Sequence, residues 1–578
     1  MKNEEQCADQ FSEFTFSYAT TATSIVIKQI EADLPKPAYE EPCDPELISF
    51  CEHINTVYEE IVHWRKNLFE VPTCAVGKKF VKLLSSWLQH FNAKTKYRCI
   101  ALKTFNILPA LLLQKPSAKS KRADHKQLLA KRLGLWENGD ILELLRMGKN
   151  VQKRLLNSSK KKTQDLARSF ANKMFEGKVT AAVRILCDDN NNGVLPLSEE
   201  TMTQLKKKHP IPTGIRDETL LYGPIMKLDS SYFDLIDGNM IGRAAKMTNG
   251  AAGPSTTDAD FFKYLLLHKK FKGEGQDLRD ELAKFARSLA SEYIDPSIID
   301  SYVNCRLIPL NKCPGVRPIG IGETVRRIVG KAIAWALKMD IQETAGPSQV
   351  CTGLKSGTEA AVHFIRQQFQ VESAEACILV DATNAFNAVN RMVMLHNIQR
   401  QCPEFSPIAI NMYRAPSRLF VCGTEIPSAE GTTQGDNLAM PLFALATLPI
   451  LQKLKELRKV MQVWLADDAS SVGTLIDLKT WWDMIVAEGI KYGYHVNPSK
   501  SCLIIKDPSS MERAMEIFGE SGIEIKITGQ RHLGAVIGSQ EYKRFYIQNL
   551  VEEWAKMINK LSDFGQSQPQ AAYAAFTH

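Results

Sequence analysis

The sequence lacks the features that mark secreted, disulfide-stabilised or membrane proteins. Its 13 cysteines include no Cys-x-x-Cys pair, and the closest pairs are Cys43/Cys51 and Cys305/Cys313. This spacing favours free thiols in a reducing compartment over a disulfide framework or a zinc cluster. The first twenty residues contain acids and no apolar core, so they do not form a secretory signal. The longest uncharged run, Asn437–Gln452, is too short to span a bilayer and contains two prolines.

Internal repeats and low-complexity tracts are also missing, which excludes a repeat array or a fibrous protein. What is present is a chain of 578 residues that is 44% hydrophobic, enough for large cores in two to four domains. The 72 Lys and Arg residues outnumber 64 Asp and Glu residues, and the net charge of +8 favours a polyanionic partner. We therefore expect an intracellular protein, in the nucleus or cytoplasm, without membrane contact.

Positive charge is concentrated in the N-terminal third. Residues 1–45 are polar and then rich in proline and acids, which predicts a flexible arm. Residues 46–200 are predicted to be a mostly helical basic region, beginning with an apolar stripe that includes Ile54, Val57, Tyr58, Ile61 and Trp64. Residues 115–168 contain 15 Lys or Arg against five acids, a balance of +10.

The densest basic clusters are Lys119, Lys121 and Arg122, and then Lys160, Lys161 and Lys162. A solvated helical face is the usual reason for such runs, and a nuclear import signal is another. If the acids further along the chain perform phosphoryl chemistry, these clusters are predicted to contact a nucleic-acid backbone.

The central motif is an apolar run, Met461–Leu465, that leads into Ala466 and the adjacent acids Asp467 and Asp468. Small residues and Val472 follow, which predicts a strand, a tight turn carrying both acids, and a second strand. Asp is common in turns for conformational reasons. Two neighbouring carboxylates also suit Mg²⁺, which prefers hard oxygen ligands.

A second acid, Asp381, ends another apolar run, Ala376–Val380, as a buried strand delivering a carboxylate at its end would. It lies 86 residues before Asp467, a separation that suits a neighbouring strand. Two strand-borne acids that face each other can hold two Mg²⁺ about 3.5–4 Å apart, the clamp used in phosphoryl transfer. The alternative is that Asp381 caps the following helix.

Four further segments supply groups that such a site would need. The loop Glu430–Asn437 holds two glycines and opens an apolar helix, Leu438–Leu454, an arrangement that lets backbone approach an anion. The stretch Leu307–Arg317, followed by Arg326 and Arg327, reads as a strand, a Pro/Gly turn and a strand with cations for a triphosphate, or as a basic surface hairpin. The remaining two segments are a loop presenting Lys500 and a strand–turn–strand at His532–Gly538.

In order and spacing, these blocks resemble the successive motifs of reverse transcriptases, most closely those of non-LTR retrotransposons and more distantly those of group II intron maturases. The resemblance covers roughly residues 290–545. It implies an α+β right-hand polymerase with fingers, an antiparallel palm sheet flanked by helices, and a thumb that is truncated here. The implied divisions are an arm (1–45), the basic region (46–200), the fingers with an N-terminal extension (201–375), the palm with the primer grip (376–540) and the start of a thumb (541–578).

The resemblance also implies roles for individual residues. Asp381, Asp467 and Asp468 match the palm acids that hold two Mg²⁺ ions, with Mn²⁺ as a substitute, and the main-chain carbonyl of Ala382 would assist. Lys500 matches a lysine that protonates the departing pyrophosphate, although an exposed lysine is the simpler interpretation. The nucleotide pocket would be formed by Lys312, Arg317, Ala382, Phe386, Gln434 and Gly435, and the primer grip by Leu533 and Gly534.

Phe386 distinguishes between polymerase types. It stands five residues after Asp381, where reverse transcriptases place an aromatic gate that leaves no room for a ribose 2′-hydroxyl. RNA-dependent RNA polymerases tend to have an acid there and Gly-Asp-Asp at the hairpin, whereas this chain has Phe386 and Ala466-Asp467-Asp468. Phe386 could equally be a core aromatic residue.

The predicted activity is therefore RNA-directed DNA synthesis, with dNTPs, an RNA template and a DNA primer as partners. Two alternatives remain open. One is an RNA-dependent RNA polymerase, which nucleotide selectivity would reveal. The other is a nucleic-acid-binding protein that keeps the polymerase shell without its chemistry, which a primer-extension assay would reveal.

Overall fold

The computed structural model of the protein describes residues 44–117, 119–157, 165–186, 193–226, 228–312 and 315–577. The predicted flexible arm lies almost entirely outside these residues, as do Lys160, Lys161 and Lys162. The predicted α+β class is confirmed, because the described residues combine many helices with sheets of four, two and five strands. Among the described residues, no helix is long and apolar enough to cross a membrane.

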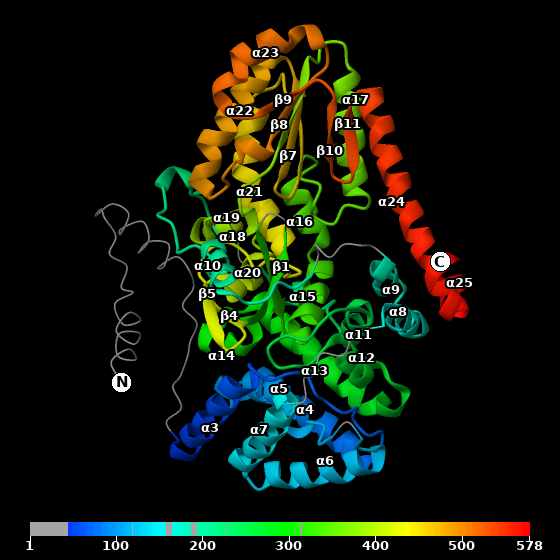
Figure 1. Cartoon of the computed structure of the whole chain (residues 1–578). Helices are drawn as coiled ribbons and strands as arrows, with labels where there is room; N and C mark the ends of the chain where they lie inside the picture. Colours follow the sequence, from blue (N-terminus) through cyan, green and yellow to red (C-terminus); the bar gives the residue numbers. More distant parts are fainter. Residues whose placement is uncertain are drawn as a thin grey trace.

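The N-terminal helices form one end of the molecule (Figure 1). The predicted apolar stripe is confirmed, since Ile54, Val57, Tyr58 and Ile61 are buried in the first of these helices. These helices are called the N-terminal layer below, and the layer packs on the next part of the chain. For example, the ring centroids of Phe91 and Phe285 lie 5.0 Å apart. Its helices are α3 (Pro45–Ile61), α4 (Ala75–Asn92), α5 (Arg98–Leu112), α6 (Arg122–Glu137) and α7 (Ile141–Asn157).

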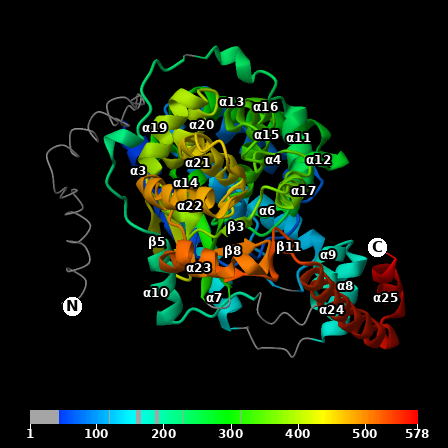
Figure 2. The same cartoon turned by 90° about the horizontal axis from the view of Figure 1, so that it is seen from above.

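The basic region does not remain together in the structure. Helices α8 (Leu166–Phe175) and α9 (Val179–Leu186) leave the N-terminal layer and pack against the last two helices, α24 (Gln540–Ser567) and α25 (Pro569–Phe576). Figures 1 and 2 both show these four helices side by side. Residues far apart in the sequence thus share one small apolar cluster.

A four-stranded sheet occupies the middle of the molecule, in the order β2-β1-β4-β5. The predicted strand–turn–strand is confirmed: β1 (Cys305–Asn311) and β2 (Val316–Gly322) are antiparallel, and β4 (Ser417–Val421) joins β1 in parallel and pairs with β5 (Thr424–Ser428). The surrounding helices are α10 (Glu199–Lys208), α11 (Gly238–Met247), α12 (Ala259–Leu267), α13 (Lys272–Ser291), α14 (Pro296–Val303), α15 (Thr324–Ala336), α16 (Lys338–Ala345), α19 (Arg391–Gln401) and α20 (Ser406–Tyr413).

A five-stranded sheet lies at the other end, in the order β6-β7-β3-β8-β9. All its pairs are antiparallel except β8 with β9. The central strand is buried over its whole length, and its residues alternate between two hydrophobic cores, which explains a continuous apolar run. Its strands are β6 (Met461–Leu465), β7 (Asp468–Gly473), β3 (Ala376–Val380), β8 (Cys502–Ile505) and β9 (Glu524–Lys526).

Helices cover both faces of this sheet. Helix α17 (Gly357–Gln370) packs on one face, and α22 (Leu475–Gly489) packs on the other with α21 (Ala439–Lys455) and α23 (Met511–Phe518) nearby. Helix α21 begins one residue later than predicted. The core is densest here, where the indoles of Trp464 and Trp481 are fully buried.

The chain ends in a hairpin followed by a long helix. Strands β10 (Gly529–His532) and β11 (Ala535–Gly538) confirm the predicted strand–turn–strand. Helix α24 begins at Gln540, because Ser539 caps it by accepting a hydrogen bond from the Tyr542 amide. None of its residues is fully buried, and Trp554 and Ile558 are exposed.

Candidate functional site

Two acids remote in sequence meet at one end of the five-stranded sheet. Asp381 directly follows β3, and Asp467 lies in the turn between β6 and β7, the strand paired with β3. Both side chains line one small cavity, of about 110 Å³. The convergence predicted from the spacing is therefore present.

The turn that carries Asp467 is a strained two-residue connection. Ala466 has a φ of 56°, which is uncommon for a residue with a side chain. Gln349 supports it, since its side chain accepts a hydrogen bond from the Ala466 amide at 3.0 Å. The Tyr494 hydroxyl donates to the Asp467 carbonyl at 2.8 Å. The prediction that both acids lie in the turn is wrong by one residue, because Ala466 and Asp467 complete the reversal and Asp468 already pairs with Leu465.

Asp381 is held by the loop that precedes β8. Its amide donates to the Ser501 hydroxyl at 3.1 Å, and its carbonyl accepts from the Asn497 amide at 2.8 Å. The Asn497 side-chain amide also donates to one Asp381 carboxylate oxygen at 3.4 Å. These contacts hold the carboxylate at the cavity. The alternative that Asp381 caps the following helix is wrong, because the N-cap residue of that helix, Ala385–Ala388, is Asn384.

The carboxylates of Asp381, Asp467 and Asp468 lie close enough to repel one another. Burial raises the pKa of Asp467, and the nearby Asp381 charge raises it further, while Lys312 and Arg317 oppose the shift. Burial and the charges of Asp467 and Asp381 raise the pKa of Asp468 to about 7. Asp468 is thus coupled to the pair, although it does not line the cavity.

A divalent cation would relieve this repulsion. Within the described ranges, no group of three or more His, Cys, Asp or Glu side chains forms a ready-made metal cage. Asp381 and Asp467 instead form an open pair beside a cavity. That donor set fits Mg²⁺, which usually keeps several waters and is held by one or two carboxylates together with substrate phosphates.

Cations face the acids across the same cavity. Lys312 and Arg317 come from the ends of the β1–β2 hairpin, as the sequence predicted, and both are exposed. Lys208, the last residue of α10, is a third cation, and sequence reasoning treated it only as a helix-ending charge. Burial and repulsion from Lys312 and Lys500 lower the pKa of Lys208. The sequence feature that could have drawn attention to Lys208 is its place in the run Lys206–Lys208.

Arg326 and Arg327 were expected among the triphosphate-binding cations, and that expectation is wrong. Arg326 is buried and forms an ion pair with Asp436 at 2.5 Å. Arg327 donates to the carbonyls of Asn249 and Ala251. Both side chains point from α15 into the protein. There they hold neighbouring loops.

The loop Glu430–Asn437 packs against the other cavity walls by backbone contact. A Cβ atom on Gly431 would lie 2.3 Å from the Phe386 carbonyl oxygen, and one on Gly435 would lie 2.7 Å from the Gly320 carbonyl oxygen. Glycine is therefore required at both positions. Gln434 lines the cavity, and Gly435 supports it from behind.

Phe386 lies in the short helix α18 (Ala385–Ala388) and lines the cavity with Ala382. Its ring packs on Phe443 of α21, with centroids 4.7 Å apart. The Phe386 side chain is half-buried, so it combines a core contact with a face that borders the cavity.

Three other predicted site residues lie outside the cavity. Lys500 is exposed on the single turn Pro498–Lys500. Leu533 and Gly534 form the β10–β11 turn, both with positive φ. That hairpin is attached to the acid-bearing sheet through His532, whose Nε2 lies 2.9 Å from the Ser470 hydroxyl. Sequence reasoning did not find this contact.

Three of the six predicted nucleic-acid-binding cations lie in the described part of the chain. Lys119, Lys121 and Arg122 precede and begin α6 with exposed side chains, and Arg122 lies 3.7 Å from Glu70. Lys160, Lys161 and Lys162 lie outside the described residues. The described cluster is part of the N-terminal layer, at the end of the molecule away from the acid pair (Figure 1).

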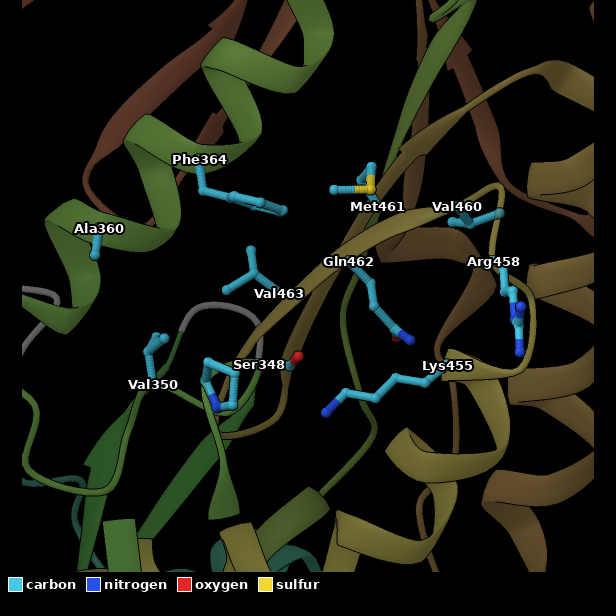
Figure 3. A pocket seen from close by; sticks show the side chains of 11 residues that line it. Ser348, Val350, Ala360, Phe364, Lys455, Arg458, Val460, Met461, Gln462 and Val463 are labelled. Carbon is cyan, nitrogen blue, oxygen red and sulfur yellow. The ribbon is translucent and has the colours of Figure 1, made fainter. Parts of the chain in front are cut away.

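A different cavity, of about 590 Å³, lies beside the edge strand β6. Figure 3 shows Phe364, Val463 and Met461 around it, with Lys455 and Arg458 at one side. No carboxylate lines it, so it lacks the acid pair that could hold a metal ion in the other cavity.

No protein-family model matches the chain, and no curated protein is significantly similar to it. The motifs and the geometry of the acid cavity therefore carry the functional proposal.

Proposed function

We propose that the chain is an RNA-directed DNA polymerase of the kind encoded by retrotransposons. The observation that carries this proposal is the composition of one cavity. Asp381 and Asp467 line it together with Lys208, Lys312 and Arg317, and Phe386 and Gln434 line the same cavity. Opposed carboxylates and cations suit a cation–triphosphate complex better than a neutral small molecule.

In the proposed reaction, a primer 3′-hydroxyl oxygen bonds to the α-phosphorus of a dNTP while the bond to the bridging α–β oxygen breaks. The products are a primer longer by one nucleotide and pyrophosphate. Asp381 and Asp467 would hold two Mg²⁺ ions, which when bound lower the pKa of the attacking hydroxyl and stabilise the leaving charge. Lys312 and Arg317 neutralise the β- and γ-phosphates, and Lys208 lies where it can share that role.

The remaining residues position these groups. Asn497 and Ser501 orient Asp381, whereas Gln349 and Tyr494 fix the turn that carries Asp467. Lys500 is exposed and borders Lys208 rather than the cavity itself, so a proton transfer from Lys500 to pyrophosphate would require the bound substrate to reach it.

Primer extension tests the proposal. The assay uses an RNA template, a DNA primer, dNTPs and Mg²⁺, and compares the wild-type chain with Asp467→Asn. We expect at least a 10³-fold loss of extension in the variant, because positioning and charge stabilisation supply most of the acceleration. Asp483→Asn, at an exposed position of α22, is the matched control and should keep wild-type activity. Full activity of Asp467→Asn would contradict the proposal.

The assay also separates the alternatives. Extension with rNTPs in preference to dNTPs would identify an RNA polymerase. Binding of primer–template without extension by the wild-type chain would leave a nucleic-acid-binding protein that lacks the chemistry.

A further inference from the structure

A second cavity, of about 750 Å³, lies between the N-terminal layer and α12. It shares no lining residue with the acid cavity, and α4, α6 and α12 lie toward the opposite end of the molecule from β7 and β8 (Figure 1). Its walls are the segment Glu70–Cys74, the start of α6, Lys115 and the end of α12 with the residues that follow.

The charge of this cavity is strongly one-sided. Lys115, Arg122, Lys126 and Lys270 line it, against the single carboxylate of Glu70. Arg122 and Glu70 are 3.7 Å apart with 93% and 58% of their side chains exposed, so this pair is weak. In the described part of the chain, no ion pair engages Lys115, Lys126 or Lys270. Positive charge therefore remains available to an anion.

Backbone dipoles add to these charges. Helix α4 begins beside the cavity, and its N-cap residue, Cys74, makes no side-chain capping hydrogen bond. Helix N-termini carry partial positive charge and favour anions, phosphate above all. Helix α6 also begins at the cavity, but the Asp124 carboxylate in its first turn accepts a hydrogen bond from the Lys121 amide at 2.8 Å and offsets that terminus. The α4 terminus therefore reinforces the cations that the side chains supply.

The cavity also has a rigid aromatic wall. The rings of Tyr264 and His268 lie 4.8 Å apart, and the Tyr264 hydroxyl donates to the Val71 carbonyl at 3.1 Å. His125 is buried, stacks on Phe69 and pairs with the Ser120 hydroxyl. Burial and the neighbouring Lys115 lower the pKa of His125, so it serves as a neutral wall rather than as a fifth cation.

We propose that this cavity binds a ligand of nucleotide size that carries two or more phosphate groups. Four cations around one concavity match multiple negative charges, and Arg122 can offer its planar fork to a phosphate. The volume lies in the range of small-molecule sites. The rings of Tyr264 and His268 are tilted by 45° to each other, so a planar ring of the ligand would stack on one of the two rather than on both. The inference goes beyond the proposed polymerase function, because it depends on none of the acid-site residues.

Calorimetric titration with inorganic tripolyphosphate tests the site. The titration uses the full chain carrying Lys312→Gln and Arg317→Gln, without divalent cations, so that binding at the acid cavity does not contribute. In that background, Arg122→Gln with Lys126→Gln should weaken binding at least tenfold. The matched control, Lys131→Gln with Lys153→Gln, removes the same charge from exposed positions outside the cavity and should change the affinity less than twofold.

Two further probes identify the source of the phosphates. Stronger binding of ATP than of tripolyphosphate, lost with the Arg122 and Lys126 changes, would support a free nucleotide as the ligand. Stronger binding of a 5′-triphosphorylated RNA tetramer than of its 5′-hydroxyl form, lost in the same variant, would support the end of a nucleic acid. If tripolyphosphate binds equally well to the cavity variant and to the control variant, or does not bind the background chain at all, the inference is wrong.

Discussion

Phe386 shows how one side chain can serve both the core and the cavity. Its ring packs on Phe443, and its side chain also lines the cavity that Asp381 and Gln434 line. If this cavity binds a dNTP as proposed, the ring limits the room beside the sugar. Truncating the ring would then remove the obstruction without removing a catalytic group.

We predict that Phe386→Ala increases rNTP incorporation relative to dNTP incorporation at least tenfold in the primer-extension assay. The change opens space for a 2′-hydroxyl, whereas Phe386→Tyr retains the ring and should retain the preference. Equal sugar selectivity in the wild type and in Phe386→Ala would show that the ring has only a packing role.

The ionised side chain of Asp468 destabilises the folded protein, and a functional role would explain that cost. Its pKa is raised to about 7 from an ordinary value near 3.8, first by burial and then by Asp467 and Asp381. Folding therefore opposes its ionisation, and the penalty grows as the pH rises from about 4 to 7. Above pH 7 the penalty is complete.

We predict that Asp468→Asn raises the free energy of unfolding by about 2 kcal/mol at pH 8, because the amide carries no charge. Urea denaturation in the presence of a chelator measures the effect, which should vanish near pH 4. Asp563→Asn, on exposed α24, is the control and should change stability by less than about 0.5 kcal/mol. A loss of stability in Asp468→Asn at pH 8 would mean that the carboxylate is favourably paired.

At the scale of elements, α24 depends on helices from the other end of the chain. Phe170 of α8 is buried and faces Phe564 of α24, with ring centroids 5.4 Å apart. Helix α24 also contacts β11, so it links the β10–β11 hairpin to α8 and α9. The cluster is small, and Phe170 is fully buried in it.

We predict that Phe170→Ala destabilises this cluster by about 3 kcal/mol and exposes α24 and α25 to local opening. Hydrogen exchange should accelerate in α8, α9, α24 and α25 and stay unchanged in β3 and β7. Phe175→Ala, on the same helix but 66% exposed, should have little effect. Uniform acceleration throughout the chain would indicate that the cluster unfolds only with the whole protein.

At the scale of the whole molecule, the five-stranded sheet and the β10–β11 hairpin meet through His532. The imidazole is buried, and burial lowers its pKa to about 4. Its folded-state pKa thus lies below the ordinary value near 6.5. Stability from this neutral histidine is present above pH 6.5 and falls as the pH drops toward 4.

We predict that acidification from pH 7.5 to pH 5 costs the wild-type chain about 2 kcal/mol through His532 alone. Chemical denaturation at both pH values, compared with His532→Asn, isolates this contribution, since the variant cannot gain the proton. His363, which is exposed on α17, provides the control variant His363→Asn. An equal pH dependence in wild type and His532→Asn would show that His532 does not couple pH to stability.

Much of this molecule could be predicted from local sequence pattern. The apolar runs at Ala376–Val380 and Met461–Leu465 become β3 and β6, and each delivers an acid where the run ends. The Pro/Gly turn between β1 and β2 and the hairpin at His532–Gly538 follow from turn chemistry. These features depend on residues close together in the chain, so the sequence by itself determines them.

The tertiary structure alone decided which distant groups meet. Arg326 carries the same charge as Lys312, yet it turns inward to Asp436, whereas Lys312 and Lys208 face the acids. Asp467 lines the cavity and its neighbour Asp468 does not, because one strained residue, Ala466, sets where the turn ends. Which of these side chains line the cavity depends on packing between elements hundreds of residues apart, and no local sequence pattern predicts it.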